Sequence, residues 1–211
     1  MTPVPLFIKV CGITRVDDAL HAVEQGATAI GFVFWPRSPR AITAAQAAEI
    51  SSRLPSHVMR VGVFVDEPVN GIRTTMEQAG LTAVQLHGDE PPAYAHALDW
   101  PVLRAVSVDQ LMHVSEMWAP ETALLVDNID PIRRGGTGTA IDWTQAAAVA
   151  HIRRVVLAGG LTPENVASAI HAVHPFGVDV SSGVEAAPGV KDFGKVSRFV
   201  TNARRAFEEL N

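Results

Sequence analysis

The sequence predicts an α/β protein, a (β/α)8 TIM barrel formed as one catalytic domain over residues 1–211. Eight short β-branched apolar segments recur roughly 20 to 30 residues apart, which leaves room for one helix after each. The segments are nearly continuous apolar runs, as is typical of parallel strands covered on both faces. No linker or break in composition marks a domain boundary, although the length also permits two small domains. An open, doubly wound sheet remains the structural alternative.

The eight predicted strands follow one another in the same pattern along the whole chain. They are the segments 6–12, 29–34, 60–65, 83–88, 102–108, 123–128, 154–159 and 177–182. Between residues 128 and 141 there is a long glycine-rich stretch with no helical or strand pattern. Long loops inside compact domains are usually functional, so this loop is expected near the site.

Helix boundaries are predicted from capping residues. Thr14 with Asp17 resembles a capping box, and Gly26 stands where that helix should end. Thr43 with Gln46 repeats the same N-terminal pattern. These signals predict two amphipathic helices after the first two strands.

Later helices carry other signals. Thr162 followed by Pro163 predicts an N-cap and a first helical residue. The apolar stripe 196–207 predicts the last helix. The helices after residues 65 and 88 are predicted less firmly, because prolines crowd their starts.

Composition restricts the function classes. Hydrophobic residues make up 47% and charged residues 18%, a globular balance, and the net charge of −5 argues against a nucleic-acid partner. The one cysteine excludes an internal disulfide, and no secretory signal or membrane span is recognisable. The chain is therefore expected to be soluble and cytoplasmic, with no membrane partner.

Candidate acid–base groups stand at the ends of predicted strands, where barrels place catalytic residues. Cys11 ends the first strand and Lys9 lies on the same face, where its ammonium group favours the thiolate. Asp127 closes the sixth strand, and a carboxyl group there suits a general acid. A small core hydrophobe at Cys11 and a loop cap at Asp127 are the plainer alternatives.

Candidate anion-binding groups surround them. Arg40 or Arg37 could hold a carboxylate through its planar guanidinium, and a solvated surface charge is favoured for Arg37. Glycine-bearing turns at 135–138, 159–160 and 181–183 follow the last three strands and predict a phosphate site, since backbone N–H groups can approach an anion there.

Two further polar residues, His87 and Asp179, are expected to line the barrel mouth. The eight histidines are scattered without ligand spacing, so no metal site is predicted. No GxGxxG motif opens a helix, so a dinucleotide cofactor is not expected either. The sequence predicts an enzyme that needs no cofactor.

Together these motifs resemble the phosphoribosylanthranilate isomerase family over nearly the whole chain. Among the matching runs, KVCGIT and DVSSGVE-x-x-PG-x-KD are highly specific when they occur together. The matching runs cover 9–14, 31–40, 61–67, 84–90, 124–128, 135–143, 157–166 and 178–192.

The resemblance implies an Amadori rearrangement of N-(5-phosphoribosyl)anthranilate to 1-(2-carboxyphenylamino)-1-deoxyribulose 5-phosphate, in tryptophan biosynthesis. It implies Asp127 as general acid at the ribose ring oxygen, Cys11 as general base at C2, and Arg40 as the group that binds the anthranilate carboxylate. Residues implied to line the rest of the substrate site are Lys9, His87 and Asp179. Residues implied to hold the phosphate are Gly136, Gly159, Gly160, Ser182 and Gly183.

The chain departs from the family pattern in the loop after the sixth strand. Thr139 replaces a lysine or glutamine found in many relatives, and Arg133 and Arg134 have no role that the sequence explains. Three other functions stay open: another sugar-phosphate isomerase barrel, a non-catalytic sugar-phosphate-binding barrel, and a thiol-redox role for Cys11. Other sugar-phosphate isomerase barrels typically use two aspartates, whereas this chain has Cys11 at the first strand. A thiol-redox role would need a resolving cysteine, and the chain has no second cysteine. A monomer and a homodimer are both compatible with the sequence.

Overall fold

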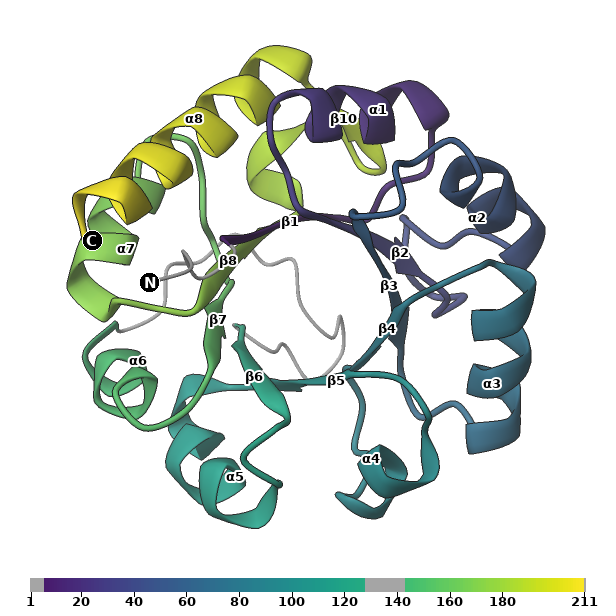
Figure 1. Ribbon diagram of the computed structural model, residues 1–211, viewed down its shortest axis with the longest axis horizontal. Helices are drawn as coiled ribbons and strands as arrows, with labels where there is room; N and C mark the ends of the chain where they lie inside the picture. The colour runs from purple at the N-terminus through teal and green to yellow at the C-terminus, as the bar shows by residue number, and fades with distance from the viewer. Residues whose placement is uncertain (1–5, 128–142, 211) are drawn as a thin grey trace.

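A closed barrel of eight parallel strands forms the centre of the molecule, and helices surround it (Figure 1). The computed structural model describes residues 6–127 and 143–210. The barrel strands are β1 Phe7–Cys11, β2 Ala29–Val33, β3 Met59–Phe64, β4 Ala83–Leu86, β5 Val102–Val106, β6 Ala123–Val126, β7 Val155–Leu157 and β8 Gly177–Val180. Each strand pairs with the next, and β8 pairs with β1 to close the ring. The predicted barrel is confirmed, and the open sheet is excluded.

One α-helix follows each strand. The helices are α1 Val16–Glu24, α2 Ala44–Ser51, α3 Val69–Gln78, α4 Ala93–Ala97, α5 Leu111–Met117, α6 Trp143–Ala150, α7 Val166–Val173 and α8 Phe193–Glu209. The 3₁₀ turn η1 Val108–Gln110 precedes α5, and the 3₁₀ turn η2 Ser182–Val184 follows β8. Among the described residues, no helix is long and apolar enough to cross a membrane.

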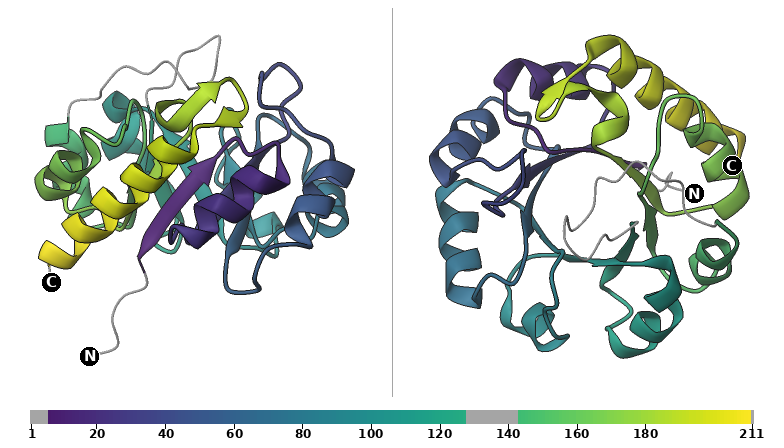
Figure 2. Two further views of the ribbon diagram at one scale, coloured as in Figure 1. Left: turned by 90° about the horizontal axis from the view of Figure 1, so that it is seen from above. Right: turned by 180° about the vertical axis from the view of Figure 1, so that it is seen from behind.

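A small hairpin that was not predicted is added to the barrel after the turn at 181–183. Strands β9 Glu185–Ala187 and β10 Val190–Lys191 pair antiparallel between β8 and α8. The hairpin lies beside α1 (Figure 1) and near the carboxyl end of β1 (Figure 2). Buried Asp18 of α1 accepts a hydrogen bond from the backbone N–H of Lys191 at 3.0 Å, which ties the hairpin to the barrel.

The core has two parts because alternate strand residues face opposite sides of the sheet. Outward-facing side chains such as Ile8 and Ile30 pack against the helices in the larger cluster. Inward-facing side chains such as Phe7, Val61 and Leu125 fill the lower part of the barrel in a smaller cluster. The inward positions nearer the carboxyl ends of the strands are polar, and there the site begins.

The helix starts confirm one capping prediction and correct two. The capping box at Thr43 is present, with Gln46 bonded back to it. Thr14 does not cap α1; Arg15 takes the N-cap position, and the Thr14 hydroxyl donates instead to the Gly189 carbonyl of the β9–β10 hairpin at 2.5 Å. This tertiary hydrogen bond replaces the local one. Gly26, with φ of +105°, follows the end of α1 as predicted.

The second correction lies beside the predicted phosphate site. Helix α7 begins at Val166 with Asn165 as N-cap, three residues after the predicted cap at Thr162. The Asn165 side chain accepts the Thr162 N–H at 2.8 Å and donates to the Gly160 carbonyl at 2.9 Å. The turn at 163–165 is therefore used to fix the glycine loop rather than to extend the helix.

Candidate active site

The candidate active site is a polar layer at the carboxyl end of the barrel. Strand alternation turns Lys9 and Cys11 of β1, Gln85 of β4 and Asp179 of β8 toward the interior, above the apolar cluster. Asp127, directly after β6, lies at the same end. Residues from four strands that are distant in sequence therefore meet in one space.

Cys11 is buried at the end of β1 and faces a glycine on the neighbouring strand. Gly31 of β2 pairs with Cys11, and a Cβ placed on Gly31 would lie 2.7 Å from Cys11 Sγ and 2.9 Å from Lys9 Cε. Glycine is needed there because both functional side chains occupy the space that any larger residue would fill.

Burial raises the pKa of the Cys11 thiol above its ordinary value, and Asp179 acts in the same direction. The Lys9 and Lys191 ammonium groups lower that pKa, but they do not offset the burial. The influence of Lys9 has the predicted sign, and desolvation outweighs it. The resting thiol is therefore neutral near pH 7.

Lys9 is completely buried and is held by two partners. Its Nζ lies 3.0 Å from Asp179 Oδ1 and donates to Gln85 Oε1 at 2.9 Å. Burial alone would lower the pKa of Lys9, but Asp179 and Cys11 raise it above its ordinary value. Lys9 is therefore a permanent ammonium group inside the barrel.

His87 connects this group to Asp127. The Gln85 amide nitrogen lies 2.9 Å from His87 Nδ1, and His87 Nε2 lies 3.8 Å from Asp127 Oδ2. The loop that carries His87 is anchored by Glu90, whose carboxylate accepts the backbone N–H of Gly88 at 2.9 Å and an Arg104 N–H at 2.8 Å. These bonds fix the imidazole at the mouth of the barrel.

Arg40 reaches the same mouth from the loop after β2. Its side chain passes over Gly12, where an added Cβ would lie 2.5 Å from Arg40 Cδ. Its Nε and Nη2 each donate to Glu185 of β9 at 2.7 Å, a two-point contact with a carboxylate. Lys191 Nζ donates to the same Glu185 carboxylate at 2.9 Å. The half-buried Arg40 and the buried Lys191 thus share one anion.

This contact qualifies the prediction for Arg40. The sequence suggested that the Arg40 guanidinium binds a carboxylate of the substrate. In the structure it is paired with the carboxylate of Glu185 in the same chain. Glu185 uses one edge of the guanidinium. The two N–H groups of Nη1 and the second N–H of Nη2 are not used by Glu185, so the other edge can still take a carboxylate in two-point fashion. Arg37 is exposed and lies over the ring of Trp35, at 5.4 Å, as a surface residue would.

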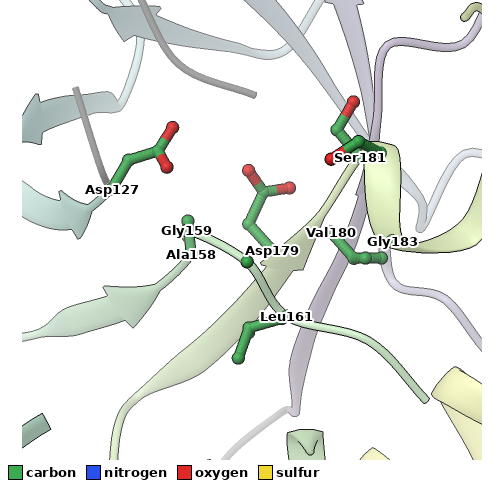
Figure 3. A pocket seen from close by; sticks show the side chains of 10 residues that line it. Asp127, Ala158, Gly159, Leu161, Asp179, Val180, Ser181 and Gly183 are labelled. Atoms are coloured by element: carbon green, nitrogen blue, oxygen red, sulfur yellow. The ribbon is translucent and has the colours of Figure 1, made fainter. Parts of the chain in front are cut away.

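A pocket beside Asp127 contains two of the three predicted phosphate-binding turns, 159–160 and 181–183. Figure 3 shows the carboxyl groups of Asp127 and Asp179 on either side of the Gly159 turn. The pocket is lined by Asp127, Ala158, Gly159, Gly160, Leu161, Asp179, Val180, Ser181, Ser182 and Gly183. Four of the five predicted phosphate residues therefore lie together; the fifth, Gly136, lies outside the described residues, as do Arg133, Arg134 and Thr139.

The glycines of this pocket have specific structural reasons. Gly159 and Gly160 both adopt φ of +70°, a left-handed conformation that favours glycine. A Cβ on Gly183 would lie only 1.9 Å from the Leu161 carbonyl oxygen, so the loops after β7 and β8 can meet only with glycine there. The two loops form one continuous wall.

Three functional candidates were missed by the sequence reasoning: Gln85, Glu185 and Lys191. A polar residue two positions before His87 could have revealed Gln85, because strand alternation puts both on one face. Glu185 and Lys191 stand inside the specific motif at 178–192, but the sequence does not show which residue they contact. Among the described residues, no group of three His, Cys, Asp or Glu side chains could hold a metal ion.

The fold and the site together define a class of protein: a TIM barrel with a buried cysteine, an aspartate and a glycine-lined pocket at the carboxyl ends of its strands. The family model for N-(5'-phosphoribosyl)anthranilate (PRA) isomerase matches residues 8–202. The chain belongs to this family, as the motifs predicted.

Individual relatives agree with the family model. An N-(5'-phosphoribosyl)anthranilate isomerase from Pelobacter propionicus is 46% identical over 203 residues, covering 96% of this chain and 97% of the relative. The crystal structure of phosphoribosyl anthranilate isomerase from Thermotoga maritima is similar, with a TM-score of 0.87, 43% identity and coverage of 95% of this chain and 99% of that one. Another similar crystal structure is that of a phosphoribosyl anthranilate isomerase in complex with reduced 1-(o-carboxyphenylamino)-1-deoxyribulose 5-phosphate. Its TM-score is 0.85 and its identity 42%, with coverage of 95% of this chain and 99% of that one.

Proposed function

We propose that this chain catalyses the Amadori rearrangement of N-(5-phosphoribosyl)anthranilate to 1-(2-carboxyphenylamino)-1-deoxyribulose 5-phosphate, as an aldose–ketose isomerase of tryptophan biosynthesis. The observation that carries the proposal is the meeting of Cys11, Asp127 and Arg40 with the glycine pocket at one end of the barrel. The relative solved with the reduced product analogue supports the substrate class.

In this reaction Asp127 protonates the ribose ring oxygen, and the ring opens to an imine. Cys11, as thiolate, then removes the proton from C2, and the resulting enamine tautomerises to the ketone. Acid and base come from β1 and the end of β6, which are separated around the barrel, so they can act at different points of one substrate. C2 is oxidised to the ketone as C1 is reduced, so the oxidation level of the substrate as a whole does not change and no external oxidant or reductant is needed.

The remaining groups bind the substrate. The free edge of Arg40 holds the anthranilate carboxylate, while Gly159, Gly160, Ser182 and Gly183 hold the phosphate through the wall formed by the last two loops. Gly136 completes the phosphate site in the proposal. Residues that line the substrate site from below are Lys9, His87 and Asp179.

The chain works in the proposal as one catalytic domain over residues 1–211, in the cytoplasm, with no nucleic-acid partner. A monomer and a homodimer both fit a site built from one chain. The phosphoribosylanthranilate isomerase of Thermotoga maritima is a dimer of which generated monomers have been crystallised.

The test follows the fluorescence of phosphoribosylanthranilate generated in the cuvette. The wild type should consume it, and Cys11→Ala and Asp127→Ala should each lower kcat by at least about 10²-fold, the low end for positioned acid–base groups. Arg40→Ala should mainly raise KM, whereas the matched control Arg37→Ala should leave KM unchanged. A folded wild type without turnover would contradict the proposed reaction, and the corresponding aldosamine of histidine biosynthesis would be tested next. Retained turnover in both Cys11→Ala and Asp127→Ala would overturn the assigned roles.

A further inference from the structure

A line of polar side chains crosses the interior of the barrel from Asp179 to Asp127. It runs through Lys9, Gln85 and His87 with successive separations of 3.0, 2.9, 2.9 and 3.8 Å. Strands β1 and β4 are not neighbours in the sheet, so the bond from Lys9 to Gln85 spans the barrel rather than an adjacent pair of strands. Lys9 and Gln85 are both fully enclosed, with exposed fractions of 0% and 2%.

The partners of Gln85 determine which way its amide group points. A lysine ammonium has three donors and no acceptor, so the Gln85 atom that faces Lys9 must be the carbonyl oxygen. The amide nitrogen then faces His87 Nδ1. An amide nitrogen can only donate, so the opposite orientation of Gln85 would place two donors against each other at Lys9.

The orientation of Gln85 in turn determines the tautomer of His87. Because Nδ1 accepts the hydrogen bond from Gln85, it carries a lone pair, and the proton of the neutral imidazole lies on Nε2. Nε2 is the ring atom that faces Asp127 Oδ2. The Lys9 ammonium therefore sets, through one amide, which atom of His87 bears hydrogen.

We propose that Gln85 is a positioning residue for the general acid: it holds His87 as the Nε2–H tautomer, and this N–H orients the Asp127 carboxyl group. The proposal rests on the proposed function, in which Asp127 protonates the ribose ring oxygen. Gln85 does not touch the substrate in this role and acts through His87 alone.

The tautomer matters because a carboxylic acid has one proton and two oxygens. With Nε2–H donating to Oδ2, the proton of Asp127 resides on the other oxygen, where it is available to the substrate. With the opposite tautomer, Nε2 would present a lone pair and accept the acid proton itself. The proton would then point at His87 and away from the ring oxygen. The separation of 3.8 Å in the free protein is long for a hydrogen bond, and such contacts tighten when substrate binds.

The ring nitrogens can be observed directly by ¹⁵N NMR of the ¹⁵N-histidine-labelled protein. The chain has eight histidines, so the His87 signals are assigned with His87→Asn. In the wild type we expect the two-bond couplings and ¹⁵N shifts of an Nε2–H ring for His87. Gln85→Glu replaces the donor by a second acceptor oxygen, so His87 Nδ1 should become protonated. Gln78→Glu, the same change at an exposed position of α3, should leave the His87 spectrum unaltered.

Kinetics provide the second measurement. Gln85→Glu should lower kcat about 10-fold or more with KM within about twofold, because a misaligned acid affects the transition state more than ground-state binding. Thermal unfolding of the same variant shows whether the fold is retained. An Nδ1–H ring in the wild type, or an Nε2–H ring that persists in Gln85→Glu, would overturn the assignment. The ring spectrum needs no turnover, so an inactive wild type would contradict the proposed reaction separately.

Discussion

Gly31 offers the sharpest test of how closely the barrel constrains Cys11, the proposed base. A methyl group added there would lie 2.7 Å from Cys11 Sγ and 2.9 Å from Lys9 Cε, whereas ordinary contacts are about 3.5–4.0 Å. The thiol must therefore move by roughly 1 Å. A misplacement of that size typically costs about 10²-fold in rate, so Gly31→Ala should lower kcat by about 10²-fold.

The fold should survive the change. Gly31 has no left-handed φ, so alanine introduces no backbone strain there, and overpacking a core costs about 1–3 kcal/mol. Gly62 on the neighbouring strand is a matched control, because its Cβ would lie 2.7 Å from Phe64 and 2.8 Å from Leu81. Those side chains belong to the outer, helix-facing core. Gly62→Ala thus produces a similar clash away from the thiol.

The assay is steady-state turnover of phosphoribosylanthranilate together with urea unfolding for both variants. We expect similar losses of unfolding free energy, and a large loss of kcat only in Gly31→Ala. The reasoning would be refuted by full kcat in a folded Gly31→Ala protein. It would equally be refuted if Gly62→Ala lost as much activity at the same stability.

Three other predictions concern Cys11, Glu185 and Arg153. Because burial raises the pKa of Cys11, its alkylation by iodoacetamide should increase with pH through a midpoint above about 8.5; a lower midpoint would contradict this. Glu185→Gln removes the anion that Arg40 and Lys191 share and that orients Arg40. KM should therefore rise about 10-fold, and the unfolding free energy should fall by about 3 kcal/mol. An unchanged KM would show that Glu185 does not orient Arg40. Arg153 donates hydrogen bonds to four carbonyl groups at and just after the end of α5, those of Ser115, Trp118, Ala119 and Thr122. Arg153→Met should therefore lower the unfolding free energy by about 3 kcal/mol in urea titration. The exposed control Arg154→Met should lower it by less than about 1 kcal/mol, and equal losses would argue against this role of Arg153.

The fold could be predicted from the sequence because its signals are local and repeated. All eight predicted strands are present, since each buried parallel strand is a continuous apolar run of its own. The β9–β10 hairpin was not predicted, because strands of three and two residues have no periodicity to detect. The cap at Thr14 failed for a related reason: its hydroxyl bonds to Gly189, a residue 175 positions away.

The residues of the site could be predicted in part, but the contacts between their side chains could not. Strand ends and glycine turns indicated Cys11, Asp127 and the pocket, because the barrel gathers the carboxyl ends of its strands. The bond from Lys9 to Gln85 joins residues 76 positions apart across the barrel, and no local pattern encodes it. The pairing of Arg40 with Glu185 joins residues 145 positions apart and was likewise invisible.

The charges around Cys11 bear on its proposed role as a base. Burial raises the pKa of the thiol and keeps it protonated at rest, while Lys9 and Lys191 lower that pKa and limit the effect. A thiolate formed from such a thiol is rarer but more basic than an exposed one, and Brønsted behaviour favours a stronger base for removing a proton from carbon. Full exposure would give a weaker base, and burial without the two ammonium groups would leave a smaller fraction of thiolate. The polar layer therefore exerts two opposing influences on the proposed base: burial raises its basicity, and the two ammonium groups raise the fraction that is ionised.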